Sequence, residues 1–113
     1  MKLVIVGAGK VGYSLAANLC GEGHDVTVID SNRRRLDILE AHLNLSVIEG
    51  NAAKLDTLRQ ADIGNTDLLI AVTEKDELNM VACFVAKSAG VKSAVARVRT
   101  PGFSDFDDAV RLD

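Results

Sequence analysis

Short apolar runs rich in Val, Ile and Leu alternate along the chain with longer stretches in which apolar residues recur every three or four positions. The short runs are typical of parallel strands buried on both faces, and the longer spacing is typical of amphipathic helices. Alternation of the two element types predicts an α/β fold, a Rossmann-like doubly wound parallel sheet in three α/β/α layers. Strands are predicted at 3–6, 25–30, 46–49, 67–72 and 93–98, and helices at 11–19, 31–42, 55–58 and 74–89.

Capping residues mark the ends of the predicted helices. Ser31 or Asn32 can cap the second helix. The pattern Thr73-x-x-Asp76 resembles a capping box at the start of the long helix, and Gly90 is suited to end that helix. These local signals support the predicted boundaries.

The C-terminal end of the chain departs from the alternation of strands and helices. After a Pro-Gly pair, Phe103 and Phe106 belong to one more amphipathic segment, which has no stop signal before Asp113. We therefore expect one Rossmann-like domain over 1–100 and, over 101–113, the start of a further helix that continues or pairs beyond the end of this chain.

Composition and charge narrow the class of protein. The 113 residues include 48% hydrophobic residues, and 13 Lys plus Arg stand against 16 Asp plus Glu, which gives a formal charge of −3. This balance is typical of one small globular domain. No basic block suits nucleic acid, and no apolar run approaches the roughly 20 residues of a membrane span. We expect a cytoplasmic protein with no nucleic-acid partner and no direct membrane insertion.

Cysteine and histidine spacing gives no sign of metal binding or catalysis. Cys20 and Cys83 lie far apart within apolar helical patterns, so both are interpreted as buried free thiols. His24 and His42 lack Cys partners at ligand spacing and are expected at the surface. No nucleophile and base occur in a recognisable catalytic pattern, so the chain is not expected to be an enzyme.

A glycine-rich motif carries the functional signal. Gly7-Ala8-Gly9-Lys10-Val11-Gly12 is a GxGxxG between a predicted strand and a predicted helix. Gly7 permits the tight turn, Gly9 lets the backbone approach a pyrophosphate, and Gly12 lets the helix pack on the sheet. Asp30, at the end of the second strand, suits the ribose hydroxyls and disfavours a 2′-phosphate, so NAD(H) is expected over NADP(H). The alternatives are an ordinary turn for the glycines and a helix cap for Asp30.

Other polar residues follow the predicted strands, where ligands bind in doubly wound sheets. Thr73 either donates its hydroxyl to a ligand or caps the next helix. Arg97 either contacts a phosphate or is solvated or ion-paired. Lys10 can reach a terminal phosphate, and the cluster 33–35 either flanks an adenine or forms a solvated helix face. The residues placed at strand ends are Asn51, Thr73, Glu74 and Arg97.

Longer stretches carry a more specific resemblance. They are KLVIVGAGKVGYSLAANL, GHDVTVID, ADIGNTDLLIAVTEKDELNMVACFVAK and ARVRTP. With these stretches the chain resembles the TrkA-N family of bacterial potassium-transport regulators, whose domains are also called RCK or KTN domains. Generic dehydrogenases share the glycines and the acid but lack the third stretch.

The resemblance implies a regulatory nucleotide-binding domain. Such a domain binds NAD(H), or alternatively ATP or ADP, and assembles as a homo-oligomer, a dimer or tetramer, on a potassium-translocating membrane subunit. It would then lie in the cytoplasm, peripheral to the inner face of the membrane. Family regulators are longer, so 101–113 is expected to begin a crossover or dimerisation helix of a longer protein.

The resemblance also implies roles for individual residues. The loop 7–11 would cradle the phosphates, with Lys10 sensing a terminal phosphate across a subunit contact, and Asp30 would hold the ribose. Thr73 and Glu74 would line the crevice, and Arg97 would approach the phosphates. Asn51 stands where family members often have Asp, so it keeps hydrogen-bonding capacity for the nucleotide but loses the charge.

Two other readings compete with this one. A cofactor domain of an NAD-dependent dehydrogenase would need a general acid or base at the nicotinamide end, and no residue qualifies. A Rossmann domain that serves only as a dimerisation scaffold would need neither the glycines nor Asp30.

Overall fold

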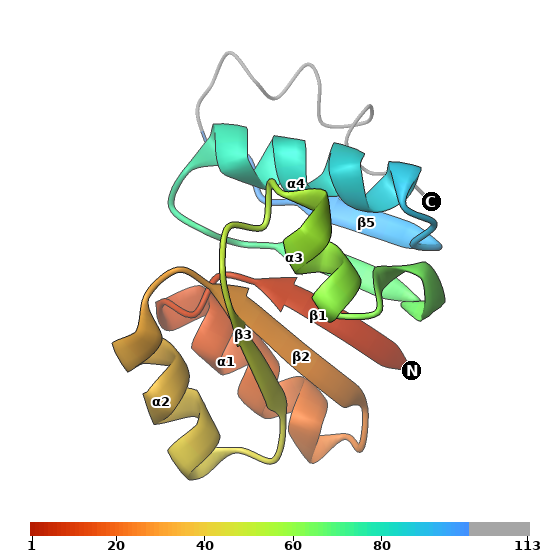
Figure 1. Ribbon diagram of the computed structural model, residues 1–113. Helices are drawn as coiled ribbons and strands as arrows, with labels where there is room; N and C mark the ends of the chain where they lie inside the picture. Colours follow the sequence, from red (N-terminus) through yellow and green to blue (C-terminus); the bar gives the residue numbers. More distant parts are fainter. Residues whose placement is uncertain (100–113) are drawn as a thin grey trace.

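A computed structural model describes residues 1–99, which form one sheet with flanking helices (Figure 1). The predicted amphipathic segment with Phe103 and Phe106, and with it the domain prediction for 101–113, lies outside the described residues. The elements are β1 Lys2–Val6, α1 Lys10–Gly21, β2 Asp25–Asp30, α2 Arg33–His42, β3 Ser46–Glu49, α3 Leu55–Gln60, the 3-10 turn η1 Ile63–Asn65, β4 Leu68–Ala71, α4 Asp76–Ser88 and β5 Ser93–Ala96.

The sheet has five parallel strands in the order β3-β2-β1-β4-β5. The chain first adds strands on one side of β1 and then, from β4 onward, on the other side. This order confirms the Rossmann-like doubly wound fold. The reversal between β1 and β4 opens a crevice at the carboxyl ends of these strands, where ligands of such folds bind.

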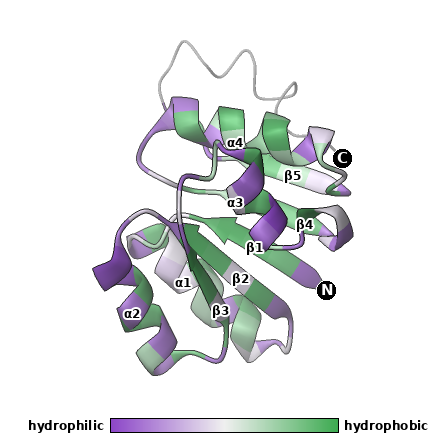
Figure 2. Cartoon of the chain, viewed as in Figure 1, coloured by the Kyte–Doolittle hydropathy of each residue, from purple (hydrophilic) through white to green (hydrophobic). Residues whose placement is uncertain are grey.

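Two apolar layers hold the helices to the sheet. Ala16 of α1 and Leu36 and Leu39 of α2 pack on one face with Leu3 and Ile5 of β1. The other face is covered by α3 and α4, as Figure 1 shows, and Ile63 of η1 belongs to the same core cluster. Figure 2 shows apolar strands between helices that carry both hydrophilic and hydrophobic residues. The three-layer arrangement predicted from the sequence is therefore confirmed.

The start of α4 differs from the prediction. The helix begins at Asp76, its N-cap is Lys75, and no side chain caps it, so the predicted capping box at Thr73 is wrong. The Thr73 hydroxyl instead lies 2.7 Å from Oδ1 of Asn79 and accepts a hydrogen bond from the Lys75 amide at 3.2 Å. By contrast, Asn32 caps α2, accepting from the Arg35 amide as expected.

Histidine positions agree with a surface placement. His24 is half-buried after α1, and His42 is exposed at the end of α2, where its Nδ1 lies 2.8 Å from the Ile38 carbonyl oxygen. Among the described helices, none has the length and apolarity needed to cross a bilayer.

The two cysteines differ in burial and should differ in reactivity. Cys83 is fully buried, and burial raises the pKa of its thiol to about 12, whereas Cys20 is only half-buried, so the prediction that both are buried holds for Cys83 alone. Because the thiolate is the reactive species, dithiobisnitrobenzoate at pH 8 should label Cys20 at least about tenfold faster than Cys83. The Cys20→Ser variant should show only the slow phase, and a fast phase in that variant would contradict the assignment.

Candidate functional site

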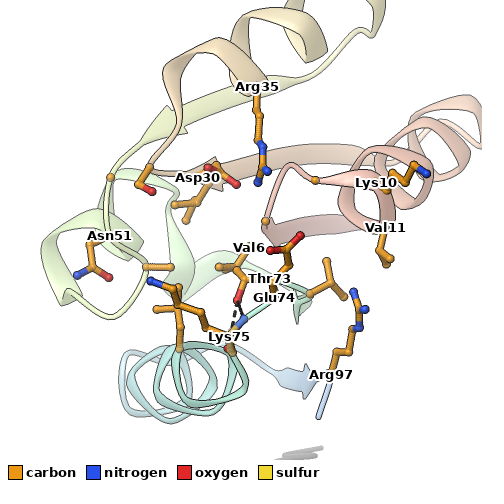
Figure 3. Close-up of a pocket in the computed structure, with 18 of the residues that line it drawn as sticks. Val6, Lys10, Val11, Asp30, Arg35, Asn51, Thr73, Glu74, Lys75 and Arg97 are labelled. Atoms are coloured by element: carbon orange, nitrogen blue, oxygen red, sulfur yellow. Dashed lines mark hydrogen bonds between the residues drawn. The ribbon is translucent and has the colours of Figure 1, made fainter. Parts of the chain in front are cut away.

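A cavity of about 640 Å³ lies at the carboxyl ends of the strands (Figure 3). It includes most of the residues predicted from the sequence and others from the same strand ends. Ala8 and Gly12 do not line it but lie behind its wall and are buried. The predicted residues that line it are Gly7, Gly9, Lys10, Val11, Asp30, Asn51, Thr73, Glu74 and Arg97.

Each of the three motif glycines is suited to its position for a different structural reason. Gly7 adopts φ +117°, and a Cβ there would lie 3.1 Å from the Thr73 amide nitrogen. A Cβ on Gly12 would lie 1.9 Å from the Gly7 carbonyl oxygen, so only glycine fits this contact between α1 and the loop. Gly9 is different, because a Cβ there would meet only Nη1 of Arg35, at 3.6 Å. The open space at Gly9 faces the cavity.

The N-terminus of α1 meets the cavity without a cap. Its N-cap is Gly9, no side chain accepts a hydrogen bond from the first turn, and that turn contains no acidic residue. The first amides of a helix have no partner within the helix, and they carry the positive end of its dipole. A phosphate group would therefore fit here, against an open glycine and unpaired donors.

Asp30 holds the glycine loop in place. Its Oδ2 accepts a hydrogen bond from the Ala8 amide at 2.7 Å, and its Oδ1 accepts one from the Asn32 amide at 2.8 Å. The N-cap of α2 is Asn32, which excludes the helix-cap alternative for Asp30. A carboxylate oxygen can accept more than one hydrogen bond. The half-buried carboxylate thus supports the loop and retains acceptor capacity toward the cavity.

The arginines at the start of α2 were expected either to flank an adenine or to form a solvated helix face, and Arg33 and Arg35 differ in this respect. Arg33 belongs to a solvated ion-pair network with Asp37, Glu40 and Glu49. Arg35 instead lines the cavity, and its guanidinium points toward the glycine loop from the side opposite Glu74 (Figure 3). The periodicity of α2 did not separate these two residues.

Positive charge predominates around the cavity. Arg97 is half-buried, lines the cavity and has no ion pair within residues 1–99, which does not favour the ion-paired alternative. Lys75 and Arg99 also line it and were not anticipated. Basic residues Lys10, Arg35, Lys75, Arg97 and Arg99 stand against acidic residues Asp30 and Glu74. This excess suits an anionic ligand.

Asn79 is a further residue that sequence reasoning missed. Its side chain is fully buried behind the cavity wall and is hydrogen-bonded to Thr73 and to the Arg97 carbonyl oxygen. One signal was available: Asn79 occupies the same helical face as Ala82, Cys83 and Ala86, where a polar residue needs a partner. The side chain of Asn51, at the far side of the cavity in Figure 3, accepts from the Ala53 amide at 2.9 Å.

Comparisons with known proteins identify the family of this chain. The TrkA-N domain model matches residues 3–108. The Trk system potassium uptake protein TrkA of Vibrio alginolyticus is 44% identical over 104 residues, which cover 91% of this chain and 23% of that protein. The chain thus spans less than a quarter of that relative.

Solved structures share the fold at low identity. The TrkA-N domain of the inner membrane protein ybaL from Escherichia coli has a TM-score of 0.87 and 20% identity, covering 99% of this chain and 83% of that one. The GsuK channel bound to NAD has a TM-score of 0.84 and 18% identity, covering 98% of this chain and 20% of that one. With its glycine loop, Asp30 and the match over 3–108, the chain belongs to the TrkA-N domain family.

Proposed function

We propose that this chain is a nucleotide-binding regulatory domain of a potassium uptake system. The observation that carries the proposal is the uncapped N-terminus of α1, which opens behind Gly9 onto a cavity with Asp30 on its wall. In this proposal NAD(H), or alternatively ATP or ADP, occupies the cavity. The Vibrio alginolyticus relative is a Trk system potassium uptake protein, and the GsuK channel, a solved structure of the same fold, is bound to NAD.

Each part of the cavity has a task in this proposal. The first amides of α1 bind the phosphates, and because Gly9 has no Cβ, the phosphates can approach the backbone closely. Asp30 accepts hydrogen bonds from the ribose hydroxyls. Lys10, Arg35 and Arg97 lower the electrostatic cost of bringing a polyanion to this site. No residue is required to make or break a covalent bond, so the domain acts as a sensor.

Regulation requires a difference between two states. A nucleotide shifts an equilibrium only when it binds one arrangement of the assembly better than the other. We propose that this domain works within a homo-oligomer, on the cytoplasmic side of a potassium-translocating membrane subunit. Phosphates contacted by Lys10 and Arg97 would supply the difference between nucleotides.

The substitution Gly9→Ala tests the nucleotide site. Gly9 has φ −76°, and its Cβ position is open, so alanine should leave the unfolding midpoint unchanged. The new methyl group occupies space that the phosphates need. Calorimetric titration with NADH, NAD, ATP, ADP and NADPH should therefore show binding to the wild type and a loss of about tenfold or more in the variant.

Gly21→Ala is the matched control for this titration. Gly21 ends the same helix, and a Cβ there would have no neighbour within 4 Å. This variant should bind nucleotides like the wild type. If no nucleotide binds the wild type, or if Gly9→Ala binds equally well, the glycine loop is a structural turn and the proposed function is wrong.

A further inference from the structure

The Asn79 side chain joins two loops of the cavity wall. Its Oδ1 accepts hydrogen bonds from the Thr73 amide at 2.9 Å and from the Thr73 hydroxyl at 2.7 Å. Its Nδ2 donates to the Thr73 carbonyl oxygen at 3.0 Å and to the Arg97 carbonyl oxygen at 2.9 Å. Both amide hydrogens are thus used, one on the loop after β4 and the other on the segment after β5.

The same loop after β4 also contacts the glycine motif. Gly7 packs so closely that a Cβ would lie 3.1 Å from both the Thr73 amide nitrogen and the Val72 carbonyl carbon. Thr73 is therefore held on one side by the glycine loop and on the other by Asn79. The Arg97 amide donates to the Ala71 carbonyl oxygen at 2.9 Å, and Asn79 adds the hydrogen bond to the Arg97 carbonyl oxygen that links this backbone to the loop after β4.

A second set of contacts ties the segment after β5 to α4. The Arg99 amide donates to Oδ1 of Asp76 at 3.1 Å, and Nη2 of Arg99 donates to the Glu74 carbonyl oxygen at 3.2 Å. Glu74 and Arg99 both line the cavity. The loop after β4 and the segment after β5 therefore form one hydrogen-bonded unit.

The burial of an amide here has an energetic cost that an apolar side chain would avoid. Asn79 is 0% exposed and lies on the helical face that otherwise carries Ala82, Cys83 and Ala86. Burying a polar group is unfavourable unless its hydrogen bonds are replaced, and a fully satisfied network fixes a specific geometry. The gain from Asn79 is therefore the fixed spacing of the two loops.

We propose that Asn79 is a positioning residue that presents Arg97 to the phosphates of a bound nucleotide and links nucleotide occupancy to the chain after β5. This role rests on the proposed function. Asn79 lies behind the cavity wall and touches no ligand itself. Its removal should weaken recognition of phosphate more than recognition of the nucleoside.

Asn79→Asp tests this role with little change in shape. Aspartate loses both Nδ2 donors and places an oxygen against the carbonyl oxygens of Thr73 and Arg97. With ADP and adenosine as probes in NMR titrations, ADP should bind about tenfold more weakly than to wild type, and adenosine within about threefold. In an Arg97→Ala background, Asn79→Asp should cause little further loss of ADP affinity, because the positioned group is already absent.

Hydrogen exchange supplies a readout that needs no ligand. The Arg99 amide should exchange faster in Asn79→Asp than in wild type, because the segment after β5 loses the Arg97–Asn79 hydrogen bond and keeps only the Arg99 contacts to Asp76 and Glu74 on that side. If Asn79→Asp does not fold, the same titrations and exchange measurements are made on Asn79→Ser, because the shorter serine side chain cannot reach both loops.

Thr66→Val is the control for a general loss of stability. Thr66 is also 0% exposed, and its hydroxyl donates to the Asp62 carbonyl oxygen at 3.0 Å, at the opposite end of β4. This variant should be less stable but should keep the wild-type ratio of ADP to adenosine affinity. A wild-type ratio in Asn79→Asp, or an equal loss of ADP affinity with and without Arg97, overturns the role of Asn79 alone. A wild type that binds neither probe overturns the proposed function and this role with it.

Discussion

Gly12→Ala should destabilise the domain by about 3 kcal/mol or more, because the new Cβ has no space between α1 and the glycine loop. It would lie 1.9 Å from the Gly7 carbonyl oxygen and 2.7 Å from the Gly7 carbonyl carbon. The loop cannot move aside, since Gly7 is itself packed against the backbone of Val72 and Thr73. Urea unfolding followed by circular dichroism measures the effect as a lower midpoint.

Gly21→Ala again gives the comparison within one helix. A Cβ at Gly21 meets nothing within 4 Å, so its unfolding midpoint should equal or slightly exceed that of the wild type. A wild-type midpoint for Gly12→Ala would mean that α1 is not packed on the loop as described. The three substitutions at 9, 12 and 21 thus separate phosphate access, helix packing and general helix propensity.

The fold was predictable because each signal is local. A buried parallel strand such as Lys2–Val6 shows as a nearly continuous apolar run, and GxGxxG combines strand end, turn and helix start in one short motif. The parallel sheet covered on both faces follows from alternating strands and helices joined by right-handed crossovers. These features depend on neighbours in sequence, so a single chain reveals them.

The start of α4 was not predictable from local pattern, because a tertiary contact replaces the local one. Thr73-x-x-Asp76 has the spacing of a capping box, yet the Thr73 hydroxyl bonds to Asn79 and the helix begins at Asp76. Within residues 1–99, the partner that decides the outcome is Asn79, which lies on the buried face of α4 one turn after the buried Asp76 and before the apolar positions 82, 83 and 86.

The charged residues of the cavity illustrate the same limit. Arg33 and Arg35 are two positions apart in α2, but one faces acidic side chains and the other the glycine loop. Arg99 enters the cavity because its backbone is held by Asp76, far away in sequence. Residue type and strand-end position identified the region of the site, whereas the direction of each long side chain depends on packing.

Asp30 has two roles in this structure, and one variant will change both. Asp30→Ala removes the hydrogen-bond acceptor of two backbone amides, those of Ala8 and Asn32. Ala8 is buried, whereas Asn32 is exposed. An unsatisfied buried donor and the loss of charged hydrogen bonds should lower stability by about 2–3 kcal/mol. Loss of nucleotide binding in this variant alone would therefore not show that Asp30 contacts the ribose.

A pair of ligands that differ by one hydroxyl separates the two roles. If Asp30 accepts a hydrogen bond from the ribose, wild type should bind ADP about tenfold more tightly than 2′-deoxy-ADP. In Asp30→Ala the two ligands should bind equally, whatever the loss they share from the disturbed loop. Calorimetric titration at a temperature where the variant is folded gives both affinities. A variant that still prefers ADP would restrict Asp30 to bracing the glycine loop and would place the ribose contact on another residue.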